Sequence, residues 1–152
     1  TPTQPACETC PLTEQCAARA AGTVAQRPVK KGTTKIRDRR FHYLHIVCGD
    51  RTVLHRRGAG DIWQGLYEFP IVETDGDPSA TEAFRRWVGT RWMQHEAVDL
   101  PKHQLSHQRI FATVHRIEVE TFTSEAEVHA VPTAEVDAYA IPRLLERYLE
   151  SR

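Results

Sequence analysis

The stretch from Phe41 to Cys48 is a nearly continuous apolar and aromatic run. A strand with this pattern has both faces buried, so its sheet must be covered on each side. Gly49 and Asp50 provide a turn, and residues 51–57 are predicted to return as a second strand. The run therefore predicts a layered α/β domain.

The segments that follow predict further strands and two main helices. A helix is expected over about residues 81–92, capped by Ser79 or Thr81, and a final helix is expected to begin near Pro142. A short capped turn is expected at Thr133. A glycine-rich loop and three further strands complete the predicted domain, and they span residues 58–65, 66–72 with an interruption at Pro70, 98–105 and 110–121.

The chain divides into three sections by composition. It has 152 residues, of which 40% are hydrophobic and 26% charged, and this suits one compact domain with a short appendage. No stretch approaches the roughly 18 apolar residues of a membrane helix, and no signal peptide is recognisable, so we expect no membrane partner and a cytosolic location. Because position 1 is not Met, we expect a piece of a longer chain. The sections are a cysteine-rich segment at 1–22, a basic linker at 23–36 and an α/β domain at 37–152.

The formal net charge of zero hides an uneven distribution of charged residues. Residues 23–58 contain ten basic residues against two acidic ones, whereas residues 118–152 contain eight acidic residues against three arginines. The basic stretch suits contact with a phosphate backbone. A solvated polar surface would have the same composition, so charge alone leaves both interpretations open.

Three cysteines near the N-terminus have the spacing of metal ligands. Cys7, Cys10 and Cys16 follow the pattern C-x2-C-x5-C. Soft thiolate ligands this close together hold zinc or an iron–sulfur cluster, although three ordinary surface thiols remain an alternative. Cys48 lies in a predicted strand and is expected to be a small core residue.

This spacing resembles the last three positions of the C-x6-C-x2-C-x5-C motif of helix-hairpin-helix DNA glycosylases of the MutY and endonuclease III type. The Cys10-Pro11-Leu12 sequence is also typical of that family. The resemblance implies that Cys7, Cys10 and Cys16 are ligands of a [4Fe–4S] cluster in a longer parent protein. The first cysteine of the motif would lie immediately before Thr1, so we expect no intact cluster in the isolated fragment.

A second resemblance covers about residues 37–152. Residues 63–70, WQGLYEFP, are similar to a signature shared by MutT-type Nudix proteins and the MutY C-terminal domain. It implies a Nudix-like mixed sheet flanked by helices, in which Trp63 and its apolar neighbours pack the turn onto the sheet. Catalytic Nudix enzymes carry a helix with R-E-U-x-E-E, where U is aliphatic, which holds Mg²⁺. The corresponding helix here has Arg85 and Arg86, and only Glu73 and Glu82 remain nearby, so the resemblance implies a retained fold without hydrolase chemistry.

The same family has an F-S-H loop that approaches 8-oxoguanine opposite adenine. Leu105-Ser106-His107 occupies the matching place, with Leu where the family has Phe. The resemblance implies that Leu105, Ser106, His107 and Gln108 contact DNA, with the Ser106 hydroxyl able to donate to and accept from the oxidised base. From the residues alone, an ordinary turn is the alternative.

Together these resemblances imply the C-terminal part of a MutY-type adenine DNA glycosylase. The parent would remove adenine mispaired with 8-oxoguanine, its partners being the duplex and its own N-terminal catalytic domain. Catalytic residues are expected in that other domain and none in this chain. Two alternatives stay open, a Nudix hydrolase of free nucleotides and a zinc-stabilised interaction module.

Overall fold

A computed structural model describes residues 4–29 and 35–152, which form two compact units. The first unit is Thr1–Lys35 and the second is Ile36–Arg152. In its described residues, 4–29 and 35, the first contains only short helical turns, which are the 3-10 helices η1 (Cys7–Thr9), η2 (Thr13–Gln15) and η3 (Val24–Gln26) and the α-helix α1 (Ala17–Ala20).

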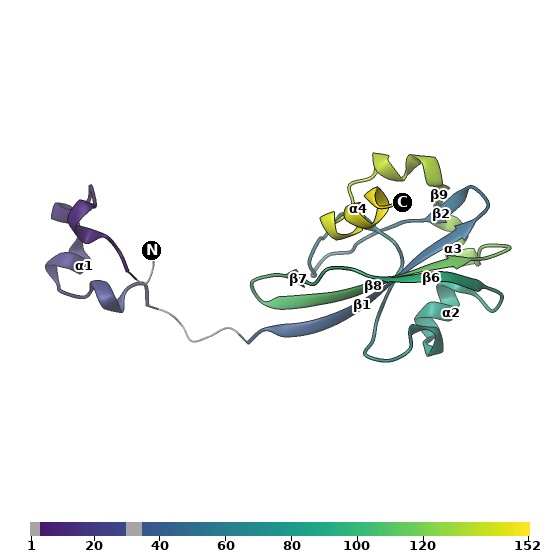
Figure 1. Cartoon of the computed structure of the whole chain (residues 1–152), viewed down its shortest axis with the longest axis horizontal. Coiled ribbons are helices and arrows are strands. Elements are labelled where there is room, and N and C mark those ends of the chain that lie inside the picture. Colours follow the sequence, from purple (N-terminus) through teal and green to yellow (C-terminus); the bar gives the residue numbers. More distant parts are fainter. Residues whose placement is uncertain (1–3, 30–34) are drawn as a thin grey trace. The chain divides into compact units, whose positions relative to one another are not determined.

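The second unit is built on a seven-stranded mixed sheet (Figure 1). Its central strands β1 and β8 are parallel, whereas the other pairs in the sheet are antiparallel. The main strand order is β6-β8-β1-β2-β9, while β5 pairs with β1, β7 pairs with β8, and β3 with β4 forms a separate small sheet. The strands are β1 (Arg37–Cys48), β2 (Arg51–Val53), β3 (His55–Arg56), β4 (Tyr67–Glu68), β5 (Ile71–Glu73), β6 (Met93–Asp99), β7 (His103–Gln104), β8 (Gln108–Glu118) and β9 (Ala130–Pro132).

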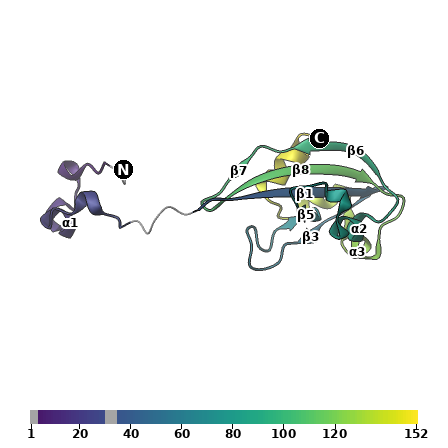
Figure 2. The same ribbon diagram turned by 90° about the horizontal axis from the view of Figure 1, so that it is seen from below.

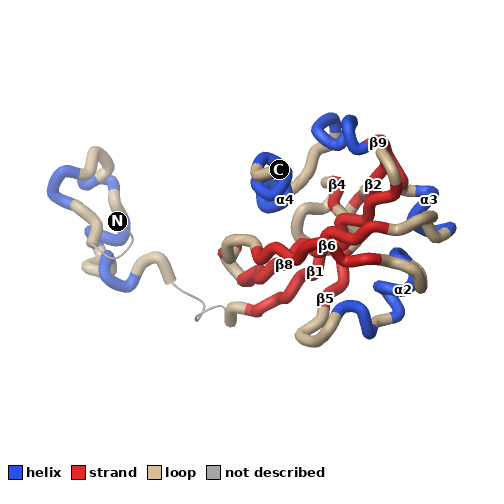
Figure 3. Tube along the Cα trace, turned by 45° about the vertical axis from the view of Figure 1, so that its right-hand side comes forward, coloured by secondary structure: helices blue, strands red, loops and turns tan. Residues whose placement is uncertain are grey.

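Helices cover both faces of the central strands, as the apolar run in β1 requires. One core forms where Phe41 and Tyr43 pack against α4, and the other forms where Leu44 and Ile46 pack against α2 and α3. Figures 1 and 3 accordingly show α4 and α2 on opposite sides of the sheet. The helical elements are η4 (Pro78–Ala80), α2 (Glu82–Val88), α3 (Ser124–Val128), η5 (Thr133–Ala138) and α4 (Arg143–Glu150). The observed architecture confirms the predicted mixed sheet flanked by helices.

One predicted helix and one predicted strand are shorter in the structure than expected. The helix expected to reach residue 92 ends at Val88, because Gly89 adopts a φ of 83°. Its predicted start is confirmed, since the Thr81 hydroxyl accepts from the Phe84 N–H at 3.1 Å. The strand expected over 51–57 is divided at Leu54, because residues 51–53 pair with β9 whereas His55 and Arg56 pair with β4 in the separate small sheet.

The strands around the β7–β8 hairpin also differ from their predicted limits. The strand expected at 98–105 is two strands, β6 and β7, and β8 begins two residues earlier than expected. β1 begins at Arg37 rather than Phe41, because residues 37–40 pair in parallel with residues 108–111 of β8. Residues 37–40 are all charged, so apolar periodicity could not predict that the strand begins there. No helix within residues 4–29 or 35–152 is long and apolar enough to cross a membrane.

Candidate nucleic-acid interface

The Ser106-His107 pair forms the exposed tip of the hairpin that joins β7 to β8. The Leu105 N–H donates to the Gln108 carbonyl at 2.9 Å and closes the hairpin. The Arg37 N–H donates to the His107 carbonyl at 3.0 Å, which ties the tip to the start of β1. Both side chains at the tip therefore extend from a backbone that is fixed on two sides.

The two residues that flank the tip attach it to the body of the domain. Leu105 is half-buried and packs against the core beneath α4. The Gln108 Oε1 atom accepts from Arg39 Nη1 at 3.1 Å. The structure thus divides the four predicted contact residues into two that are exposed and two that support the loop.

The loop at residues 58–66 lies against this hairpin. The Trp63 ring lies 5.6 Å from the His103 ring and 6.4 Å from the Phe41 ring, centroid to centroid. Trp63 has a φ of 58°, which is unusual for a large side chain, and Gly65 has a φ of 83°. The signature residues therefore pack the loop onto the sheet and bring it beside β7. Figure 2 shows β7 and the first part of β1 at the same end of the sheet.

Arg39 connects the loop, the hairpin and β5 through a cluster of carboxylates. Its Nε and Nη2 donate to the two carboxylate oxygens of Glu73 at 2.8 and 2.6 Å. Its Nη1 and Nη2 donate to the two oxygens of Asp61 at 2.6 and 2.8 Å. Only 8% of the Arg39 side chain is exposed, so these paired contacts replace its hydration.

A second arginine extends the cluster toward the interior. Arg57 donates to Asp61 at 2.7 Å and to Glu68 at 2.5 Å. Glu68 is the glutamate of the WQGLYEFP stretch and is 1% exposed. This glutamate therefore has a structural partner, and its side chain does not reach solvent.

The pKa values of the cluster follow from these contacts. Hydrogen bonds from Arg39 hold the pKa of Asp61 and of Glu73 well below their usual ranges, and those carboxylates raise the pKa of Arg39. Burial raises the pKa of Glu68, although Arg57 opposes this effect. The outer part of the cluster is consequently a fixed set of charges at neutral pH.

Much of the basic charge in residues 23–58 is neutralised within the domain. Five of its arginines form ion pairs with carboxylates, which reduces the charge available to a phosphate backbone. These arginines are Arg37, Arg39, Arg40, Arg51 and Arg57. Lys30 and Lys31, which also contributed to the predicted basic linker, lie outside the described residues.

The helix that contains Arg85 and Arg86 is α2. Glu73, one of the two acids that remain near it, is bound by Arg39. Arg85 on this helix donates to the Ala80 carbonyl at 3.2 Å. Among the described residues, no group of three or more His, Cys, Asp or Glu side chains is arranged to hold a metal ion.

The three N-terminal cysteines are free thiols in the first unit. Cys7 and Cys16 are half-buried and Cys10 is exposed. Cys10 follows η1, and Cys16 is the N-cap of α1. As they lie here, the three thiols do not meet at one centre, so a cluster would require them to rearrange and a fourth ligand to join them.

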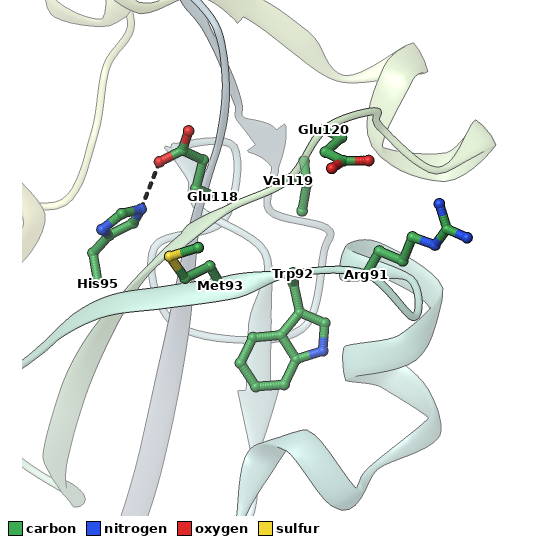
Figure 4. Close-up of a pocket in the computed structure, with 7 residues that line it drawn as sticks. All are labelled: Arg91, Trp92, Met93, His95, Glu118, Val119 and Glu120. Atoms are coloured by element: carbon green, nitrogen blue, oxygen red, sulfur yellow. Dashed lines mark hydrogen bonds and ion pairs between the residues drawn. The ribbon is translucent and has the colours of Figure 1, made fainter.

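A separate pocket lies beside the first residues of β6 (Figure 4). Its volume is about 380 Å³, and two of its lining residues, His95 and Glu118, are in contact at 2.5 Å. Because Met93 pairs with Glu118 at the far end of β8 from the hairpin, this pocket is not part of the candidate interface.

Sequence reasoning missed the role of Arg39, which was counted only as one of the basic residues. The signal was present, since Arg39, Phe41 and Tyr43 alternate along β1 and therefore share a face. That signal could be used only if the strand was known to begin at Arg37.

Comparisons with known proteins agree with this fold. Residues 42–151 match the family described as NUDIX domain. The C-terminal domain of mouse MUTYH, solved in complex with human PCNA, is similar with a TM-score of 0.52 and 17% identity, covering 75% of this chain and 86% of that one. A MutT protein from Methanosarcina mazei has a TM-score of 0.56 at 12% identity, covering 76% and 93%. The E. coli ORF135 protein has a TM-score of 0.51 at 20% identity, covering 76% and 91%.

Proposed function

This chain belongs to the NUDIX-domain family, and we propose that residues 36–152 are the lesion-recognition domain of a MutY-type adenine DNA glycosylase. The domain would contact 8-oxoguanine in its pair with adenine, while a separate catalytic domain of the parent protein removes the adenine. The observation that carries the proposal is the exposed Ser106-His107 tip, whose backbone is fixed by Arg37 and Leu105.

The tip suits a base edge because its polar groups are held in advance. 8-oxoguanine differs from guanine by an N7–H donor and an O8 acceptor, and a serine hydroxyl can serve either. Such contacts are worth about 1–3 kcal/mol, or roughly tenfold to over a hundredfold in discrimination. His107 would contact the base or a phosphate, and Leu105 and Gln108 would hold the loop in place.

The acids that remain near α2 support a binding role rather than hydrolysis of nucleotides. Glu73 is engaged by Arg39, and α2 carries Arg85 and Arg86 where a Mg²⁺ site needs carboxylates. Catalysis is therefore assigned to the N-terminal domain of the parent. The mouse MUTYH domain is in complex with PCNA, so protein contacts are compatible with this fold, but the hairpin favours duplex DNA as the partner.

We further propose that Cys7, Cys10 and Cys16 are three of the four ligands of a [4Fe–4S] cluster in the parent enzyme. The support is the donor set, three thiols at the family spacing in a unit distinct from the domain. The cluster would stabilise that unit of the parent. Iron and acid-labile sulfide analysis of the parent and of its Cys10→Ser variant tests this assignment.

The test of the main proposal is adenine release by the parent enzyme carrying Ser106→Ala and His107→Ala together. Single-turnover rates would be measured on duplexes with 8-oxoguanine·adenine and guanine·adenine pairs. We expect a selective loss of about tenfold or more on the oxidised substrate. His95→Ala serves as a control, because His95 is also exposed but lies on β6 toward the far end of β8.

Equal effects on both substrates, or none, would contradict the proposal. Two further assays of the isolated chain address the alternatives. Mg²⁺-dependent release of pyrophosphate from 8-oxo-dGTP would support a nucleotide hydrolase. Stoichiometric zinc that depends on Cys10, with no preference for lesion DNA, would support an interaction module.

A further inference from the structure

Two histidines that are 73 residues apart in sequence meet on the α2-facing side of the sheet. The Nδ1 atom of His42 lies 3.0 Å from the Nε2 atom of His115, and the ring centroids are 5.2 Å apart. His42 is on β1 and pairs with Thr113 of β8, two residues before His115. These residues belong to different strands, so only the pairing of β1 with β8 brings them together.

A backbone contact fixes the tautomer of His42. Its Nε2 atom lies 3.2 Å from the Thr74 carbonyl oxygen, which can only accept a hydrogen bond. Nε2 therefore carries the proton, and Nδ1 presents a lone pair toward His115. This arrangement, with one ring nitrogen donating to a carbonyl and the other free, is the one that metal-binding histidines adopt.

The separation of the two nitrogens is close to what one metal ion requires. Zinc binds histidine nitrogen at about 2.0–2.1 Å, so two nitrogens on a tetrahedral ion lie about 3.3 Å apart. The observed 3.0 Å needs to widen by only a few tenths of an ångström, and the proton that His115 now donates from Nε2 moves to Nδ1 of the same neutral ring. The existing hydrogen bond thus holds both rings in the position of a two-histidine site.

Carboxylates nearby favour a cation at this point. Asp99 pairs with Thr113 and accepts from its hydroxyl at 2.6 Å, so it lies on the same face as His42. Asp77 interacts electrostatically with both histidines and now accepts hydrogen bonds from Ser79. Arg40, two residues before His42 on the same face of β1, is paired with Asp75 at 2.8 Å, so its charge is neutralised.

The site has a route to solvent. A pocket of about 300 Å³ is lined by His42, Asp99, Thr113 and their neighbours on β1 and β8. His115 is 9% exposed, and burial and the neighbouring His42 lower its pKa, so its ring is neutral and able to bind a metal at pH 7. An ion could enter through the pocket together with the water needed to complete its coordination.

We propose that His42 and His115 bind one divalent transition-metal ion of the zinc type. Asp77 turns away from Ser79 to become the third ligand, and water occupies the fourth position. The bound ion links β1, β8 and the loop before η4, and it does so independently of the DNA-binding hairpin.

The test uses the full chain with Cys7, Cys10 and Cys16 changed to Ser. ZnCl₂ is titrated into this chain at pH 7.5, and isothermal titration calorimetry measures the binding. Removing these thiols excludes zinc binding in the first unit. We expect one ion per chain, a higher unfolding temperature with zinc, and affinity at least about tenfold lower for His42→Gln and for His115→Gln. His95→Gln is the matched control and should bind zinc as tightly as the chain with unchanged histidines.

Nitrogen-15 NMR of the histidine rings keeps the test decisive if a variant folds poorly. Zinc should shift His42 Nδ1 and His115 Nε2 in the unsubstituted histidine background and leave the His95 ring unchanged. Absence of stoichiometric binding, or shifts confined to other histidines, would overturn the proposal. Loss of affinity in Asp99→Asn but not in Asp77→Asn would overturn the assignment of the third ligand.

Discussion

Arg39 shows how one buried charge organises the end of the domain where the hairpin lies. It reaches Glu73 on β5, Asp61 in the 58–66 loop and Gln108 at the start of β8. Arg39 therefore joins the hairpin, the loop and β5, in addition to the packing of Trp63 on His103.

Replacing Arg39 with Met should destabilise the domain by about 3 kcal/mol, because Asp61 and Glu73 would be left close together without a cation. The figure is at the lower end of the usual range, since both carboxylates are about one-third exposed and can recover some hydration. Urea unfolding measures the change. Arg37→Met is the control, because 71% of the Arg37 side chain is exposed and its contact with Glu73 is longer, at 3.4 Å; similar losses for both variants would contradict this account.

The same cluster should make the domain sensitive to acid. The pKa of Asp61 and of Glu73 is lowered in the folded state, so their contribution to stability is complete above the unfolded values of 3.8 and 4.5 and is lost as pH falls below them. We expect the unfolding free energy to fall more steeply below about pH 4.5 in the unsubstituted chain than in the Arg39→Met variant. Parallel slopes in the two chains would show that other groups dominate acid unfolding.

His45 should act in a higher pH range. It is buried, stacks on Phe69 at 4.4 Å and lies 3.0 Å from the Tyr148 hydroxyl, and burial lowers its pKa from 6.5 to about 4. The unfolded chain binds the proton more readily, so stability should be complete above pH 6.5 and fall by roughly 2–3 kcal/mol toward pH 4.5. His55 and His115 have pKa values lowered in the same direction and should add to the loss.

His45→Gln tests this assignment, because glutamine retains a polar group near Tyr148 but does not titrate. Urea unfolding at pH 7.0, 6.0 and 5.0 should show a weaker dependence on pH in the variant. An unchanged dependence would mean that the other buried histidines account for it.

At the scale of elements, the loop at 58–66 is fixed by backbone conformation as well as by side chains. Gly65 has a φ of 83°, and a Cβ atom there would lie 3.5 Å from the Arg56 guanidinium, which is an ordinary contact. The cost of adding a side chain therefore arises from the dihedral angle rather than from lack of space. The path of the loop to β7 therefore requires a residue at this position that accepts a positive φ.

Gly65→Ala should consequently destabilise the domain by about 1–2 kcal/mol. Gly58→Ala in the same loop is the matched control, since a Cβ atom there would have no neighbour within 4 Å and its φ lies outside the positive range that strains a side chain. It should change stability by less than about 0.5 kcal/mol. Thermal unfolding of the two variants compares them directly. Equal destabilisation would show that the positive φ of Gly65 is not the cause of the loss.

At the scale of the whole molecule, the second unit contains both hydrophobic cores. Their buried members all fall between Phe41 and Tyr148, on the two faces of β1 and β8. We expect the free energy of unfolding of a chain of residues 36–152 to lie within about 0.5 kcal/mol of that of the 152-residue chain. Calorimetry of the two chains measures this, and a lower unfolding temperature for the shorter chain would show that residues 1–35 stabilise the domain.

The sequence by itself determined the layered fold and the location of the loop at 58–66. The apolar run at 41–48 required a covered sheet, and Gly65 and Pro70 marked the loop and the break between β4 and β5. These features are local, since periodicity and backbone preference act over a few residues.

Only the tertiary structure decided which polar groups meet. Arg39 and Asp61, and likewise His42 and His115, come from segments that only the pairing of strands brings together. Parallel pairing of β1 with β8 also extended β1 back to Arg37 through polar residues that carry no apolar signal. Such contacts depend on register between distant strands, which is set by packing of the whole sheet and not by the residues nearby.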